Sequence, residues 1–437
     1  MLKSCLILGL ACACSSSAAS PDSPSQPGAP GGSNGLAGGT STGSSAAGDG
    51  TAGSADSNHG GNIGSGGEPS AAGSGGSGGE PAALGGNGGS VAGVAGNSGD
   101  SGKAGSAGSG GSANTEPAIH WIGRVARTAS GARFSWPGTG FSARFNGTGA
   151  SASLKTSNMD YLQLIVDGQV SLLTTQSGSH IYTLARGLVS GEHTLTLWRR
   201  TEPNHGTIEA GPITFDGSLL APPVPATHRL EVIGDSLTVG FGLECKTNAE
   251  PFSYATENNY LTYQALAARK FSAELSTLAW SGLGVWRNVG GDFIQPIPVR
   301  YLRTIPNEDT TSTWDFSSYT PDAVLINLGK IDFAKGDPGQ PFVDAYQAFV
   351  VDLRKHYAKA RLYLAVSPML SGAQIAQEKA YLVTVKSARA AAGDNNIALI
   401  EFARPPIDEW GCGHPTGTAH AVMATLFEQA LTTDLGW

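Results

Sequence analysis

Residues 230–238 read LEVIGDSLT, a short apolar run that leads directly into a glycine and a serine. The run predicts a buried strand, and Gly234 allows a sharp backbone turn after it. In an open parallel sheet, ligands bind beyond the carboxyl ends of the strands, so Ser236 is placed where a ligand would lie. The amides that follow such a serine can point at an oxyanion. In the alternative interpretation, Asp235 or Ser236 only caps the next helix.

Strands and helices alternate along the rest of the chain. Further strands are predicted at 322–328, 361–366 and 397–402, and helices at 259–271, 342–359, 373–392 and 418–431. This βαβα order implies a parallel sheet that is covered by helices on both faces. We therefore predict an α/β domain over residues 226–437.

A different pattern precedes this domain. Between residues 117 and 222, short alternating apolar runs are broken by turn residues, and no helical period appears. Asp167-Gly168, directly after one such run, is a strong hairpin signal. We predict an all-β sandwich of the jelly-roll type, joined to the α/β domain by the Pro-rich segment 221–225.

The first 116 residues contain no Phe, Tyr or Trp and are dominated by Gly, Ser and Ala. Such a composition cannot bury enough apolar surface to offset its ordering entropy, which predicts a flexible tether over 14–116. Residues 1–13, in which Lys3 and an apolar run precede small residues, resemble a secretory signal. Cys14 fits a bacterial lipobox; Cys12 as the lipid site, or a signal without lipid, are the alternatives. We expect an exported protein, lipid-anchored at the bacterial cell envelope or surface, or else secreted.

Charge and composition exclude several partners. The net charge is −8 and no basic run occurs, which argues against nucleic acid. No apolar stretch reaches the ~18 residues of a membrane span, so we expect membrane contact only through the lipid anchor. No cysteine or histidine cluster has the spacing of a metal site, and we expect no metal, no cofactor and a monomeric protein.

A serine nucleophile needs a base, and His414 is the best placed of the nine histidines. It lies in the Gly-rich loop 410–416, between the last predicted strand and the last predicted helix, at the sheet end where Ser236 also emerges. His420 lies inside the last predicted helix, where packing is the simpler interpretation. We predict that Ser236 is the nucleophile and His414 its base.

This order of serine and histidine is that of the GDSL/SGNH hydrolases. Residues 279–284, AWSGLG, are similar to the second block of these enzymes, and residues 327–333, NLGKIDF, to the third, usually written NLGTNDF. With the all-β region in front, ATEN at 255–258 and GVWRN at 284–288, the chain most resembles carbohydrate esterase family two.

The resemblance implies an SGNH-type, flavodoxin-like sheet and an acetyl esterase that acts on plant polysaccharides such as xylan and mannan. It also implies an oxyanion hole formed by the amides of Ser236 and Gly282. Asp235 and Gly284 are further candidate residues of this site.

The chain departs from the family pattern at two positions. Ile331 stands where the third block has an asparagine of the oxyanion hole, and an apolar side chain cannot donate a hydrogen bond. Lys330 beside it could substitute, although strand alternation points it elsewhere. Gly411 stands where an aspartate usually precedes the histidine by three residues. The nearest acids are Asp408 and Glu409, so a backbone carbonyl alone could orient His414.

Cys245 follows the nucleophile loop, and Cys412 lies two residues before His414. If both loops line one crevice, the two thiols are close, and an oxidising compartment favours their pairing. We predict a disulfide between them; two free buried thiols are the alternative.

The leading hypothesis is therefore a tethered polysaccharide deacetylase. One alternative, motivated by Ile331, is a weakened homologue that only binds glycan. Another is a lipolytic or aryl esterase of the same superfamily. Against the latter, the expected crevice carries Trp280, Trp286 and Trp410, which suit sugar faces better than an acyl chain.

Overall fold

The structure is a computed structural model that describes residues 118–308 and 312–437. The predicted signal segment, the tether and Cys14 lie outside the described residues. No helix within the described ranges is long and apolar enough to cross a membrane.

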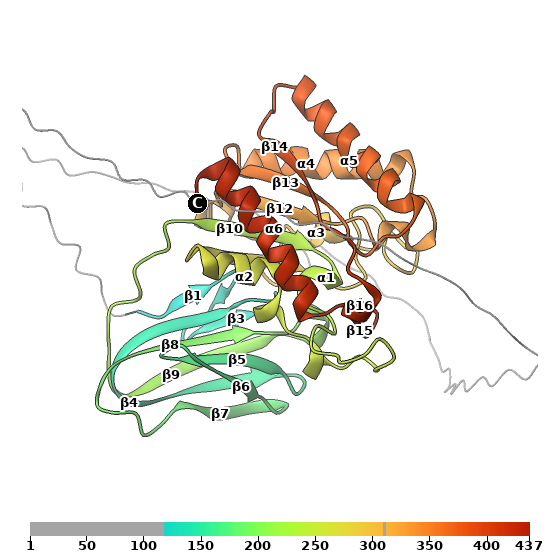
Figure 1. The fold of residues 1–437 in the computed structure, drawn as a ribbon. Helices are drawn as coiled ribbons and strands as arrows, with labels where there is room; N and C mark the ends of the chain where they lie inside the picture. Colours follow the sequence, from blue (N-terminus) through green and yellow to red (C-terminus); the bar gives the residue numbers. More distant parts are fainter. Residues whose placement is uncertain (1–117, 309–311) are drawn as a thin grey trace, which may run out of the picture. The chain divides into compact units, whose positions relative to one another are not determined.

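The β domain comes first along the described chain (Figure 1). Its strands are β1 (His120–Ile122), β2 (Ala126–Arg127), β3 (Ala132–Phe134), β4 (Gly140–Thr156), β5 (Tyr161–Val166), β6 (Gln169–Thr174), β7 (Gly178–Ala185), β8 (Gly191–Arg199) and β9 (Ile208–Leu219). They pair antiparallel in the order β2-β3-β9-β4-β8-β5-β6, with β1 and β7 also on β4. The long strand β4 pairs with β8 in its first half and with β7 in its second, so one sheet encloses one apolar core.

The predicted hairpin is confirmed. Val166 pairs with Gln169, and both residues between them have positive φ, 50° at Asp167 and 79° at Gly168. Two successive left-handed residues define the two-residue turn whose twist matches that of antiparallel strands.

The second part of the chain is the predicted α/β domain. Its parallel strands are β10 (Arg229–Gly234), β11 (Glu274–Ala279), β12 (Ala323–Asn327), β13 (Arg361–Val366) and β14 (Ile397–Glu401), in the order β11-β10-β12-β13-β14. Its helices are α1 (Ser236–Val239), α2 (Tyr263–Lys270), α3 (Ile297–Arg300), α4 (Gln340–His356), α5 (Ala373–Ala391) and α6 (Gly417–Leu435).

Alternate residues of the strands face the two helical layers. Ile233 and Ile326 pack in a core with residues of α4 and α5, whereas Val232 and Leu325 pack in a second core with residues of α2 and α6. Both faces of the sheet are thus covered, as Figure 1 shows, and the predicted three-layer fold is confirmed.

Strand β11 was not predicted from the sequence. Its centre carries Ser276 and Thr277, which are buried, and these polar residues interrupt the apolar run that marks a buried strand. The predicted helix at 259–271 is also shorter than expected. A 3-10 turn, η3 (Asn259–Leu261), comes first, and α2 begins at Tyr263.

Buried arginines of the β domain contact the α/β domain. The Arg124 guanidinium is 1% exposed and lies 3.4 Å from the carboxylate of Glu231 on β10. The Arg200 Nε donates to the carbonyl of Glu257 at 3.0 Å. Such charges are buried only where partners offset their lost hydration, so these contacts fix the β domain against the α/β domain.

Candidate active site

Ser236 is the first residue of α1, and only Asp235 separates it from the end of β10. Gly234 makes this turn possible, because an added Cβ there would come within 2.1 Å of the Thr238 hydroxyl. Asp235 caps α1 by accepting the backbone N–H of Leu237 at 3.1 Å. Burial raises the pKa of Asp235 to about 7. Asp235 is therefore a helix cap, as the alternative interpretation predicted, while Ser236 beside it remains the candidate nucleophile.

His414 lies in the short strand β16 (His414–Pro415), and its side chain reaches the serine. Nε2 of His414 is 2.8 Å from Oγ of Ser236. Its Nδ1 is 3.3 Å from the carbonyl oxygen of Cys412, whereas the carboxylate of Glu409 accepts from Thr416 instead. A backbone carbonyl thus orients the imidazole, in a serine–histidine dyad geometry.

Burial lowers the pKa of His414 to about 4, and the nearby charge of Lys330 acts in the same direction. The imidazole is therefore neutral at neutral pH, which is the form that can accept a proton from a hydroxyl. His420, the other histidine of this region, is buried and stacked on Tyr263. It packs in the core, which was its simpler interpretation.

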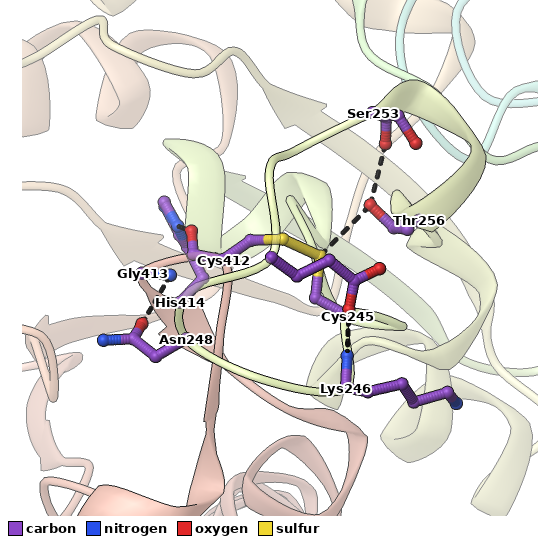
Figure 2. The surroundings of a disulfide bond; sticks show 9 residues. Cys245, Lys246, Asn248, Ser253, Thr256, Cys412, Gly413 and His414 are labelled. Atoms are coloured by element: carbon purple, nitrogen blue, oxygen red, sulfur yellow. Dashed lines mark hydrogen bonds between the residues drawn. A yellow bond between two sulfur atoms is a disulfide. The ribbon is translucent and has the colours of Figure 1, made fainter.

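A disulfide joins the serine loop to the histidine loop (Figure 2). Cys245 and Cys412 are bonded, with their Cα atoms 5.8 Å apart. The side chain of Asn248 also accepts the Gly413 N–H at 2.7 Å, as Figure 2 shows. An added Cβ at Gly411 would come within 2.5 Å of the Cys245 carbonyl. The close approach of the bridged loops therefore leaves no room for the aspartate that is usual at this position.

The oxyanion side of the site is the turn from Trp280 to Leu283, directly after β11. The Leu283 N–H donates to the Trp280 carbonyl at 3.4 Å, and Gly282 has a φ of 79°, a value that favours glycine. Among the described residues, neither the Gly282 N–H nor the Ser236 N–H has a hydrogen-bond acceptor. Two unpartnered donors next to a serine–histidine pair are what an oxyanion hole requires.

Asp332 holds the loop that follows this turn. Its carboxylate accepts the N–H groups of Val285, Trp286 and Arg287 at 3.0, 2.8 and 2.9 Å. An added Cβ at Gly284 would lie 2.6 Å from the same carboxylate, so Gly284 serves close packing. Asp332 is part of the quoted third block, yet no role for it was foreseen.

Ile331 directly precedes Asp332 and is 7% exposed. Its side chain carries no donor, so the structure provides no third oxyanion group there. Lys330 differs from expectation. Strand alternation does not extend to it, because β12 ends at Asn327 and Gly329 turns the chain with a φ of 143°. The positive charge of Lys330 partly offsets the rise that burial causes in the pKa of Asp235. It also adds to the fall that burial causes in the pKa of His414.

The tryptophans are only partly arranged as expected. Trp410 is 8% exposed and belongs to the core, so its prediction as a sugar-facing residue was wrong. The partly buried rings of Trp280 and Trp286 each lie under an arginine, Arg300 at 4.2 Å and Arg287 at 5.0 Å. Phe241, which no sequence motif marks, has its ring centroid 4.5 Å from that of His414. No group of metal-ligating side chains occurs in the described parts of the chain.

This arrangement is that of a serine hydrolase of the GDSL type. The serine follows a buried strand, a histidine pairs with it, and two backbone amides of the site have no acceptor among the described residues. Family models agree with this assignment. Residues 232–422 match the GDSL-like Lipase/Acylhydrolase family, and residues 121–223 match the model for the N-terminal region of carbohydrate esterase 2. The chain belongs to carbohydrate esterase family two and is an esterase.

Known relatives share both domains. The chain is 33% identical over 330 residues to the cellulase/esterase CelE of Acetivibrio thermocellus, covering 74% of this chain and 40% of that relative. The chain thus spans less than half the length of CelE. It is 25% identical over 335 residues to an acetylxylan esterase / glucomannan deacetylase of Cellvibrio japonicus, covering 74% of this chain and 91% of the relative.

Solved structures that are similar to this chain include two family two carbohydrate esterases. One is a family two carbohydrate esterase from Clostridium thermocellum in complex with cellohexaose, 33% identical, with a TM-score of 0.70 over 73% of this chain and 100% of that one. The other is a family two carbohydrate esterase from Cellvibrio japonicus, 25% identical, with a TM-score of 0.69 over 74% of this chain and 97% of that one.

Proposed function

We propose that this chain removes O-acetyl groups from polysaccharides of the xylan or mannan type, through an acetyl-enzyme on Ser236. The observation that carries the proposal is the 2.8 Å contact between Ser236 and His414 beside two free backbone donors. Membership of a carbohydrate esterase family supports the substrate class, as does the relative that is an acetylxylan esterase / glucomannan deacetylase.

In the proposed reaction, Oγ of Ser236 attacks the acetyl carbonyl carbon while Nε2 of His414 takes the hydroxyl proton. The N–H groups of Ser236 and Gly282 hold the carbonyl oxygen as it becomes negative. The histidine then gives the proton to the departing sugar oxygen, which leaves an acetyl ester on Ser236. A water molecule, activated by the same histidine, hydrolyses this ester and releases acetate.

Aromatic rings extend from His414 toward the β domain. Phe241 is stacked on Phe252, with ring centroids 3.6 Å apart, and beyond Phe252 the ring of Tyr254 is stacked on His205 at 3.8 Å. A hollow of about 480 Å³ follows, lined by Asn158, Met159, Tyr161, Asn204, His205, Ser253 and Tyr254. Flat rings beside amide and hydroxyl groups suit a sugar, which supports a polymer as substrate.

Two assays test the proposal. One measures hydrolysis of p-nitrophenyl esters of increasing acyl length, and the other measures acetate release from acetylated xylan and glucomannan. We expect a preference for acetyl over longer acyl groups and acetate release from at least one polymer. Tyr254→Ala should raise the KM for the polymer more than the KM for p-nitrophenyl acetate. A preference for long acyl chains would favour the lipolytic alternative, and no activity above Ser236→Ala the glycan-binding one.

We also propose that the protein is exported and lipid-anchored through Cys14. The signal-like residues 1–13 support this, as does the pairing of Cys245 with Cys412, since disulfides persist in oxidising compartments. Mass spectrometry of the mature protein tests it: a diacylglyceryl group on Cys14 is expected, and a cleaved terminus without lipid would show a secreted protein instead.

A further inference from the structure

The donor that Gly282 offers belongs to a peptide group held through its two neighbours. The next peptide group along the chain is fixed because the Gly282 carbonyl accepts the Val289 N–H at 2.9 Å. The preceding one is fixed by the Ser281 N–H, which donates to Oε2 of Glu202 at 2.6 Å. The direction of the Gly282 N–H therefore depends on both contacts.

Glu202 does not come from the hydrolase domain. It follows β8 of the β domain and precedes the 3-10 turn η1 (Pro203–His205). Its side chain is 1% exposed, so it reaches the Trp280–Leu283 turn through a junction that excludes water. A carboxylate so deeply buried is stable only where hydrogen bonds and charges compensate for its lost hydration.

A network of charged groups fixes the backbone of Glu202. The backbone N–H of Glu202 donates to the buried Glu257 at 2.6 Å, and its carbonyl accepts from the Arg199 guanidinium at 3.1 Å. Arg199 is fully buried and also pairs with Asp160 at 3.2 Å. Burial raises the pKa of Glu202 to about 7, while the Ser281 N–H and Arg199 oppose this rise. The Glu202 side of the Ser281 contact is thus held in place by buried partners.

We propose that Glu202 is a positioning residue of the oxyanion hole, through which the β domain orients the Gly282 N–H in the active site. This inference rests on the proposed roles of Ser236 and Gly282. The β domain is then part of the catalytic unit and not a separate binding module. The contact acts on a group that matters most when charge develops on the substrate oxygen, so its loss should lower kcat more than it raises KM.

Two substitutions at Glu202 separate the acceptor from the charge. Both Glu202→Gln and Glu202→Leu remove the charge beside Arg199, but only Gln keeps an oxygen that can accept the Ser281 N–H. On p-nitrophenyl acetate, we expect kcat of Glu202→Leu to fall about 10- to 100-fold, with KM little changed. This fall is smaller than the roughly 10²- to 10³-fold loss that follows removal of an entire oxyanion-hole donor, because the Gly282 N–H is misdirected but still present. Glu202→Gln should stay within about threefold of wild type. Turnover is normalised to active sites titrated with an organophosphate that reacts with Ser236.

Ser281→Pro removes the donor from the other partner, at a turn position that tolerates proline. We expect Ser281→Pro and the double variant Glu202→Leu/Ser281→Pro to have equal kcat, because both lack the same bond. If Glu202→Leu folds poorly, Glu202→Gln and Ser281→Pro still test the contact from each of its two partners. Glu192→Gln, which alters an exposed carboxylate paired with Arg144, is the matched control and should be unchanged.

The proposal is overturned if Glu202→Leu retains wild-type kcat, if Glu202→Gln loses as much as Glu202→Leu, or if the losses in the double variant are additive. Failure of the proposed function would look different, because wild type itself would then not exceed Ser236→Ala.

Discussion

On the side of the nucleophile and base, Ser236 and His414 lie 2.8 Å apart on two loops that a disulfide joins covalently. On the oxyanion side, no disulfide occurs at the turn that carries Gly282 among the described residues; it is held by packing and hydrogen bonds, one of which is accepted by Glu202 of the β domain. The first side contains every group that a serine–histidine dyad requires. The second lacks a side-chain donor, because Ile331 has none, so backbone groups and their positioning must supply the stabilisation.

The largest effect is expected at the dyad. Ser236→Ala or His414→Ala should lower turnover of p-nitrophenyl acetate by about 10³-fold or more, because the nucleophile or its base is lost. Ser387→Ala, at an exposed serine of α5, is the matched control. More than a few per cent of wild-type activity in Ser236→Ala would show that the nucleophile is another residue.

The disulfide should contribute mainly to stability. It closes a sequence separation of 167 residues, and the chain-entropy account gives about 5 kcal/mol for so long a loop, as an upper bound. The double variant Cys245→Ser/Cys412→Ser should therefore unfold at a clearly lower temperature by calorimetry, with reduced turnover because the His414 loop is released. Wild type treated with reductant should behave like the variant, and the variant itself should not respond. Equal unfolding temperatures would contradict this account.

Ile331→Asn tests whether the oxyanion side is incomplete. Wild-type turnover should be low, and the new amide should raise kcat by up to about 10²-fold with a smaller effect on KM. Ile331→Leu, which adds no donor, is the matched control. If wild type is already fully active and Asn brings no gain, another group fills the hole. Lys330 would then be the candidate, and Lys330→Met should be strongly impaired.

The smallest effect concerns pH. Burial lowers the pKa of His414 to about 4, because the charged imidazolium is poorly solvated there. Since only the neutral ring is a base, kcat/KM should hold its plateau in mildly acidic solution and fall by half near pH 4. Lys330→Met should move this midpoint upward, since it removes a charge that opposes protonation. A midpoint near the ordinary histidine value of about 6.5 would contradict the account.

The residues that the sequence predicts and those that it does not predict differ in how they are positioned. Ser236, Gly282 and His414 are marked by short motifs at the carboxyl ends of strands, and the order of the elements implied the α/β fold. Local patterns were enough because each residue is positioned by the element that precedes it.

The interactions that were missed join distant parts of the chain. No local pattern marks Glu202, because its partner at Ser281 is 79 residues away and belongs to the other domain. Strand β11 was missed because its buried centre is polar, and Trp410 was misassigned because a Gly-rich loop gives no sign that its ring turns into the core. Such burial is decided by tertiary packing.

In the proposed mechanism, the acetyl group of the substrate is carried transiently on Ser236. The most direct test of this mechanism is to quench wild-type protein during turnover of p-nitrophenyl acetate and to locate any acetyl group by peptide mass spectrometry. The account predicts acetylation on the peptide that contains Ser236, and none there in Ser236→Ala. An acetyl group on another residue, lost from it at the rate of turnover, would contradict this mechanism.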